Sequence, residues 1–192
     1  MADDARLRIL DAAGRCIERR GDTQIRMAEV ADDAGVVRST VYRYFPTRDE
    51  LLLGLVLTRI DAALARLVRS LRRPDDPRRC IPRMVLVPVD SVDGDPLNEA
   101  LFASASTALS AALELGSEEI VDVVIAHYEP LFANWQAAGE MYPDLDRREV
   151  ARWIHTAALF LLSPPWRHRS HVSKRRFVDQ FVVRALVPQI GH

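Results

Sequence analysis

Several features that mark particular classes of protein are missing from this sequence of 192 residues. It contains a single lysine, Lys174, and its formal net charge is −1, so the whole protein cannot act as a polycation toward nucleic acid. Any contact with nucleic acid must come from a local patch of arginines. Two cysteines, Cys16 and Cys80, lack the spacing of metal ligands, and no secretory signal or membrane-spanning run is present. These absences predict a cytoplasmic protein with reduced thiols, no bound metal and no association with a membrane.

The sequence motifs of common enzyme classes are also missing. There is no glycine-rich phosphate loop, no pair of carboxylates arranged on one helix face, and no nucleophile elbow. His168 and His171 in WRHRSH have ligand-like spacing, but arginines surround them and no carboxylate or thiol lies beside them. We interpret this stretch as a solvated linker, and we predict that the chain is not an enzyme and needs no cofactor.

Apolar residues recur with a helical period over most of the chain, and no stretch alternates convincingly as a strand. Together with the cap signals, this predicts an all-α fold of about nine helices. One segment stays open, because Pro88 in MVLVPV fits either a kinked helix or a short strand. The expected helices cover, approximately, residues 4–20, 27–34, 37–45, 48–72, 78–90, 96–115, 117–138, 147–162 and 173–187.

Two of these helices are short and are joined by a tight turn. The helix at residues 27–34 ends at Gly35, because glycine adopts the left-handed backbone conformation at little energetic cost. The helix at residues 37–45 ends at Pro46. Such a pair, with an exposed and polar second helix, is typical of a helix-turn-helix unit, whose second helix enters the major groove of DNA. Val41 and Phe45, four residues apart, are expected to face inward and anchor this second helix.

The remaining side chains of the second helix suit a polar and charged surface. Its hydroxyl groups can bond to bases or phosphates, its arginines can donate in bidentate fashion to guanine, and its tyrosines can reach phosphates. Arg48 lies at the start of the next helix, where an anion is favoured. The predicted DNA contacts are Arg38, Ser39, Thr40, Tyr42, Arg43, Tyr44 and Arg48.

The stretch EVADDAGVVRSTVYRYFPTRDELL resembles the DNA-binding domain of the TetR family of bacterial transcriptional regulators, over about residues 6–55. The resemblance implies a helix-turn-helix DNA-binding domain in residues 1–47 and a helical effector-binding and dimerisation domain in residues 48–192. It also implies a dimeric regulator, usually a repressor, that binds a palindromic operator and is released when a small molecule moves the fourth helix. A DNA-binding regulator with no small-molecule effector stays open as the alternative.

Two positions depart from the family pattern. A small hydroxyl residue usually caps the second helix and touches phosphate, and Arg26 stands in its place. Arg26 can still reach a phosphate, so it joins the predicted DNA contacts, but loss of the cap bond costs about 1 kcal/mol. The recognition helix often begins with a polar residue where this chain has Val37.

The resemblance further implies that the last two helices form the dimer, and both carry broad apolar stripes. Paired with a symmetry mate they would make a four-helix bundle, although the same stripes also fit the chain's own core. The predicted interface residues are Val150, Trp153, Ile154, Ala157, Leu161, Phe177, Phe181, Val182 and Ala185.

A ligand cavity among the middle helices is the last implication of the resemblance. Apolar and aromatic residues with a few polar groups are the usual lining of such sites, and at helical spacing they also fit plain core. No cluster of charges is present among them, so we expect an effector that is mostly apolar and uncharged, or aromatic. The candidate effector contacts are Met84, Phe102, Leu109, His127, Tyr128, Phe132 and Trp135, with His127 and Tyr128 as the polar contacts.

Overall fold

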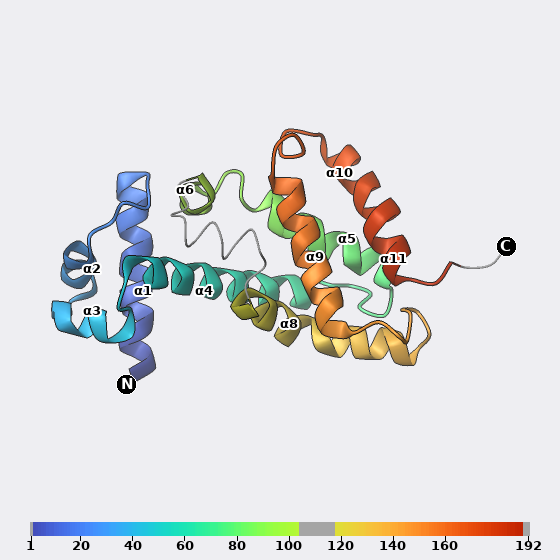
Figure 1. Ribbon diagram of the computed structural model, residues 1–192, viewed down its shortest axis with the longest axis horizontal. Coiled ribbons are helices and arrows are strands. Elements are labelled where there is room, and N and C mark those ends of the chain that lie inside the picture. Colours follow the sequence, from blue (N-terminus) through green and yellow to red (C-terminus); the bar gives the residue numbers. More distant parts are fainter. Residues whose placement is uncertain (1, 104–117, 190–192) are drawn as a thin grey trace. The chain divides into compact units, whose positions relative to one another are not determined.

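The computed structural model describes residues 2–103 and 118–189, and throughout these ranges the ordered elements are helical, with no strand (Figure 1). The all-α prediction is therefore confirmed. Residues 77–90, where a strand was the alternative, form one helix that contains Pro82 and Pro88. The elements are α1 (Ala2–Arg20), α2 (Met27–Ala34), α3 (Arg38–Tyr44), α4 (Arg48–Arg69), α5 (Pro77–Asp90), α6 (Pro96–Ala103), α8 (Glu118–Ala137), α9 (Arg147–Leu162), α10 (His171–Phe177), η1 (Val178–Val183) and α11 (Arg184–Leu186).

Helix ends follow the local sequence at most boundaries. Gly35 closes α2 in the left-handed conformation, with φ 64°, and its N–H bonds to the carbonyls of Ala31 and Asp32. The Asp146 carboxylate accepts a hydrogen bond from the N–H of Glu149 at 3.0 Å and so caps α9. Thr47 caps α4 in the same way, because its hydroxyl accepts from the N–H of Glu50 at 3.1 Å.

The last helix differs from the expectation in two ways. It begins at His171 rather than at Ser173, because Ser170 is the capping residue and accepts from the N–H of Ser173 at 3.3 Å. A serine at the third helical position looks like a cap in the sequence, but here its backbone N–H donates the cap bond to the Ser170 hydroxyl. The helix also widens to π geometry over Val178–Val183 before α11.

The described chain divides into two compact units. The first consists of residues up to Arg59 together with the segment from Ser91 through α6. Within it, the Asp33 carboxylate of α2 forms ion pairs with Arg15 and Arg19 of α1, at 2.6 Å and 2.9 Å. The hydrogen bond from Arg15 lowers the pKa of Asp33. Its buried apolar core includes Ile9, Leu10, Ile17, Val30, Val41, Phe45, Leu51, Leu52 and Leu55.

The second unit consists of Ile60–Asp90 and the chain from α8 onward. Here α9 packs against both α5 and α8, and the Trp135 indole donates to the carbonyl of Pro74 at 2.6 Å. The buried side chains of this unit include Ile81, Met84, Val85, Val124, Phe132, Trp135, Ile154, Leu161, Val178 and Val182. α4 contributes residues to both units, since the boundary falls between Arg59 and Ile60.

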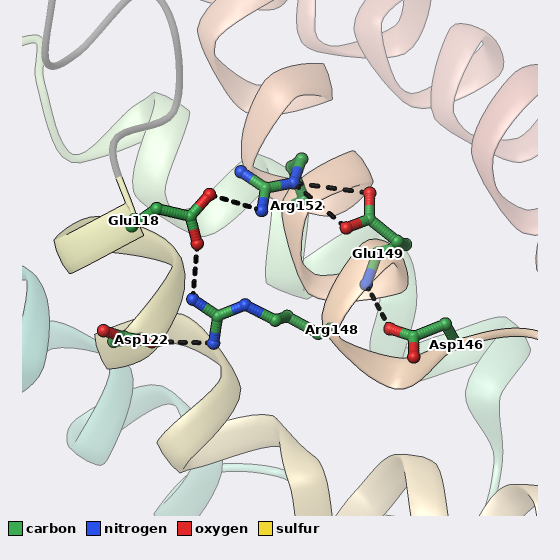
Figure 2. A network of polar contacts seen from close by, with 6 residues as sticks. All are labelled: Glu118, Asp122, Asp146, Arg148, Glu149 and Arg152. Carbon is green, nitrogen blue, oxygen red and sulfur yellow. Dashed lines mark hydrogen bonds and ion pairs between the residues drawn. The ribbon is translucent and has the colours of Figure 1, made fainter.

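Charged side chains fasten the start of α8 to α9 (Figure 2). Arg148 lies 2.6 Å from Glu118 and 2.7 Å from Asp122, and Arg152 lies 2.8 Å from Glu118. Hydrogen bonds from Arg148 and Arg152 lower the pKa of Glu118. Because the network is exposed to solvent, each pair adds little stability, and its main effect is to fix how these two helices align.

Two further expectations concern organisation. Among the described helices, none combines the length and the apolar character required to cross a membrane. The functional boundary expected between residues 47 and 48 stays a prediction, because the compact units record packing and not which residues contact DNA.

Candidate nucleic-acid interface

The second helix of the helix-turn-helix, α3, is anchored by two buried side chains. Val41 is fully buried and Phe45 is 4% exposed, as their spacing predicted. Phe45 in turn lies against α4 at Gly54, where an added Cβ would stand 2.8 Å from the Phe45 ring. Only glycine permits this approach without displacing the ring, so Gly54 helps to set where Phe45, and with it α3, lies.

The outer face of α3 carries the predicted contact residues. Arg38, Ser39, Tyr42 and Arg43 are exposed, while Thr40 and Tyr44 are half-buried. No residue of α3 is acidic, and every positive charge on this face is a guanidinium. We name these six residues the reader face.

Neighbouring side chains restrain the two arginines of the reader face. Arg38 donates to the Tyr42 hydroxyl at 3.1 Å, and its guanidinium lies 5.4 Å from the centre of the Tyr42 ring. Arg43 lies 5.1 Å from the centre of the Tyr44 ring. Such cation–π contacts hold guanidinium groups in a narrow set of orientations, so less freedom is lost when they bind a partner.

Two more predicted contacts flank α3. Arg48 is half-buried, and its Nη1 donates to the Gln24 side chain at 2.8 Å. Arg26 is exposed and makes no cap bond, as its side chain predicts, although the Glu29 carboxylate accepts from the Arg26 backbone N–H at 3.4 Å. Both guanidinium groups therefore belong to the same helix-turn-helix unit as the reader face, and their contact with phosphate stays a prediction.

Replacing Arg48 with alanine should weaken binding to every duplex to a similar degree. A contact to phosphate carries no sequence information. The slope of log K against log salt is negative, and loss of the contact makes it less steep by about one unit for each protomer bound. Anisotropy titrations at several salt concentrations measure this slope. Arg69→Ala, at the other end of α4, is the matched control and should leave the slope unchanged, and an equal change in both variants would contradict the assignment.

The candidate effector contacts lie in different environments. Met84, Phe132 and Trp135 are buried in the second unit, where the rings of Phe132 and Trp135 lie 5.7 Å apart. His127 is instead tied to Asp61 of α4 by a contact of 2.8 Å from its Nε2. Leu109 and the side chain of Phe102 lie outside the described part of the structure.

Among the residues that the structure describes in the second unit, the Tyr128 hydroxyl and Nε2 of His155 are buried polar atoms for which no hydrogen-bond partner is found in the same described part of the chain. Buried polar groups are nearly always satisfied, so each of these atoms requires an explanation. Burial raises the pKa of Tyr128, which stays protonated, and burial lowers the pKa of His155 to about 4, so its imidazole is neutral near pH 7. His155 lies within an apolar stripe of α9, so its only signal in the sequence is that it is an isolated histidine there.

The burial of His155 makes stability depend on pH. Its pKa is about 4 in the folded chain and near 6.5 when unfolded, so the unfolded chain takes up the proton first. Its contribution is therefore complete above about pH 6.5 and is lost as the pH falls toward 4. When the pH is lowered from 7.5 to 4.5, the free energy of unfolding should fall in both proteins. We expect the fall measured by urea titration to be about 2–3 kcal/mol smaller in His155→Leu than in wild type. His168 is exposed, so the His168→Leu variant should show the same pH dependence of stability as wild type. The same pH dependence in His155→Leu would show that the His155 side chain is solvated.

The predicted dimer residues separate into two groups. Val150, Ile154, Ala157, Leu161 and Val182 are buried within the chain itself, so they belong to its core and have little surface left for a second copy. Trp153 and Phe181 are 40% and 58% exposed, Ala185 is exposed, and Phe177 is half-buried. Each apolar stripe is wide enough to contribute both to the core of the chain and to a dimer interface. Periodicity alone does not show which residues of a stripe face the core and which face outward.

Four aromatic rings gather beside the exposed group. Phe177 lies 5.3 Å from Phe160, 4.8 Å from Trp166 and 5.1 Å from Phe181, between ring centres. We name Phe160, Trp166, Phe177 and Phe181 the aromatic cluster. Its outer members, Phe160 and Phe181, are 43% and 58% exposed, which is a costly arrangement for a surface that faces only water.

Comparison with known proteins gives matches over the front end and over the whole chain. The family described as "Bacterial regulatory proteins, tetR family" matches residues 9–55. The regulator EthR of Mycolicibacterium smegmatis is 33% identical over 97 residues, which is 49% of this chain and 44% of that protein. The repressor KstR of Mycobacterium tuberculosis is 32% identical over 79% of this chain and 66% of its own length. An HTH-type regulator of M. tuberculosis is 28% identical over 94% of this chain and 85% of its own length.

The first two curated relatives are matched over only about half of their length, 44% and 58%. Among solved structures, the repressor QsdR of Rhodococcus erythropolis has a TM-score of 0.70 at 17% identity and covers 99% of both chains. A regulator from Saccharomonospora viridis in complex with choline has a TM-score of 0.53 at 22% identity, over 97% of this chain and 100% of its own. At these identities the structures establish the fold alone.

Proposed function

Because the chain belongs to the TetR family of bacterial regulatory proteins, we propose that it is a transcriptional regulator that binds a palindromic operator as a dimer and represses until a small molecule releases it. Its relatives are named as transcriptional regulators and not as enzymes. KstR is named a repressor, which favours repression over activation here.

The observation that carries this proposal is the reader face. A short helix fixed by Val41 and Phe45 presents arginines, hydroxyls and tyrosines with no acidic residue among them. The major groove admits one α-helix, and its base edges and flanking phosphates are bound by these side-chain types.

A palindromic operator requires two copies of the reader face related by two-fold symmetry. The aromatic cluster, with Trp153 two helical turns before Phe160 on α9, supports this requirement because it offers exposed apolar surface on the last two helices of the chain. The exposed members of the predicted interface are the residues that we assign to the dimer.

The effector proposal is supported by the two buried polar atoms for which the described residues supply no hydrogen-bond partner, the Tyr128 hydroxyl and Nε2 of His155. A protonated Tyr128 hydroxyl and a neutral His155 can bond to a ligand that carries no charge, and the neighbouring side chains of Tyr128 include the Phe132 ring, with 5.8 Å between ring centres. We therefore propose a mostly apolar, uncharged effector. Tyr128 stays in the candidate set, His155 joins it, and His127 is assigned to its contact with Asp61.

Release would follow from a shift between two arrangements of α4. A ligand that prefers one arrangement changes operator affinity by a coupling free energy, typically about 1–3 kcal/mol. Gly54 and Phe45 give such a shift a route to the reader face, because any movement of α4 at Gly54 changes the space that holds the anchor of α3.

The test is an anisotropy titration of the protein against the intergenic DNA that flanks its own gene, with a scrambled duplex as control and at two salt concentrations. Selective binding that saturates at two chains per palindrome is expected. Equal, weak and salt-sensitive binding to both duplexes would contradict the proposal. A panel of uncharged apolar and aromatic compounds is then added to the complex, and failure of every compound to release the operator would favour a regulator without a small-molecule effector.

A further inference from the structure

Val37 is an apolar side chain that the folded unit does not use. It is 68% exposed, the most exposed large hydrophobic side chain described in the first unit, followed by Leu7 at 48% and Tyr42 at 38%. It therefore contributes almost nothing to the core. An isolated exposed valine is unremarkable on most surfaces, and its position here gives it a meaning.

That position is the residue immediately before α3. Val37 has an extended backbone, with φ −72° and ψ 147°, and its side chain makes no bond to the helix that follows. Serine, threonine, aspartate or asparagine at this place would satisfy a free N–H group, and an aliphatic residue forfeits that bond. Neither capping nor packing accounts for a valine here.

The neighbours of Val37 are residues of the reader face. Arg38 and Ser39 follow it directly and both are exposed, and its own carbonyl accepts from the N–H of Thr40 at 2.8 Å. When such a helix lies in the major groove, the residues at its N-terminal end meet the base edges. The apolar feature of that groove is the C5-methyl group of thymine, which no other DNA base carries.

We infer that Val37 determines sequence specificity by covering the C5-methyl group of a thymine in each half of the operator. The inference rests on the proposed function and names the base chemistry that the reader face selects. Burial of one methyl group against the valine is worth about a fourfold change in affinity, or about 15-fold over two symmetric half-sites.

Deoxyuridine tests the inference because it differs from thymidine in DNA only by the missing methyl group. Each symmetric pair of thymines in the operator is replaced in turn, and the dissociation constant is measured at one salt concentration. For the wild type, replacement of one particular thymine pair by deoxyuridine should lower the affinity about 15-fold. The Val37→Ala variant should bind the thymine operator more weakly and should lose the sensitivity to that same pair.

One further variant and one stability measurement sharpen the result. Thr40→Ser removes the other methyl group near this end of α3, and it should keep the sensitivity at the pair assigned to Val37. Thermal unfolding of Val37→Ala should match that of wild type, because the side chain is exposed.

Three results would be decisive against the inference. Full sensitivity to deoxyuridine in Val37→Ala would overturn it, and so would a wild type that is insensitive at every thymine. Both results are read in a protein that binds its operator selectively, so they leave the proposed function standing. A wild type that does not discriminate the thymine operator from scrambled DNA would instead overturn the proposed function, and the inference with it.

Discussion

Replacing Arg43 with alanine should abolish selective binding to the operator while the free energy of unfolding changes by no more than about 0.5 kcal/mol. Arg43 is exposed, and its guanidinium lies over the Tyr44 ring without a carboxylate partner among the described residues of α3. A bidentate contact to a base is worth about 1–3 kcal/mol per half-site, so a palindrome should lose at least about 30-fold in affinity. Tyr42→Ala should behave similarly, because it also frees the guanidinium of Arg38.

Anisotropy titration measures the affinity, and urea denaturation measures the stability of the same preparations. Arg69→Ala removes an exposed arginine from the second unit and should keep both properties. A fall in stability of several kcal/mol in Arg43→Ala would show that α3 is buried by something else and that the reader face is wrongly placed. Unchanged operator selectivity would show that another surface reads the DNA.

Phe181→Glu should convert the proposed dimer into monomers and thereby remove tight binding to the proposed operator. Phe181 is 58% exposed and packs on Phe177 at 5.1 Å, so the chain folds without burying it fully. At the centre of a two-fold interface the substitution acts twice, and each desolvated carboxylate without a partner costs several kcal/mol. Sedimentation or light scattering at micromolar concentration measures the change in mass.

Val87→Glu is the matched control for this prediction. Val87 is 41% exposed on α5 of the same unit and lies outside the aromatic cluster, so this variant should remain dimeric. Trp153→Glu should follow Phe181→Glu if the interface extends along α9. A folded dimer from Phe181→Glu would remove the aromatic cluster from the interface, and monomers from both Val87→Glu and Phe181→Glu would show general destabilisation.

Local features of the sequence predicted the helix-turn-helix in detail. Gly35 and Pro46 bound the two short helices because each imposes a backbone constraint that neighbouring residues do not override. The spacing of Val41 and Phe45 identified the anchors of α3 for the same reason, since four residues bring two side chains to one helix face. In these cases the physics operates within a few residues of the chain.

Features that depend on distant neighbours were predicted less well. Nothing within α8 indicates that His127 meets Asp61 of α4, and nothing within α9 separates the core side of its apolar stripe from the side that holds Trp153. His155 shows the same limit, because its importance comes from a missing partner and sequence spacing does not reveal partners. Caps compete as well, and Ser170 prevails over Ser173 at the last helix.

The guanidinium character of the reader face has a consequence for how the protein responds to acidity. The first histidine of the sequence is His127, and the only lysine is Lys174, so residues 1–126 carry no side chain that ordinarily titrates near neutral pH apart from Cys16 and Cys80, and burial raises the pKa of both thiols. Arginine stays charged at any pH a cell reaches. The strength of DNA binding should then follow the ionic composition of the medium and change little with its proton concentration.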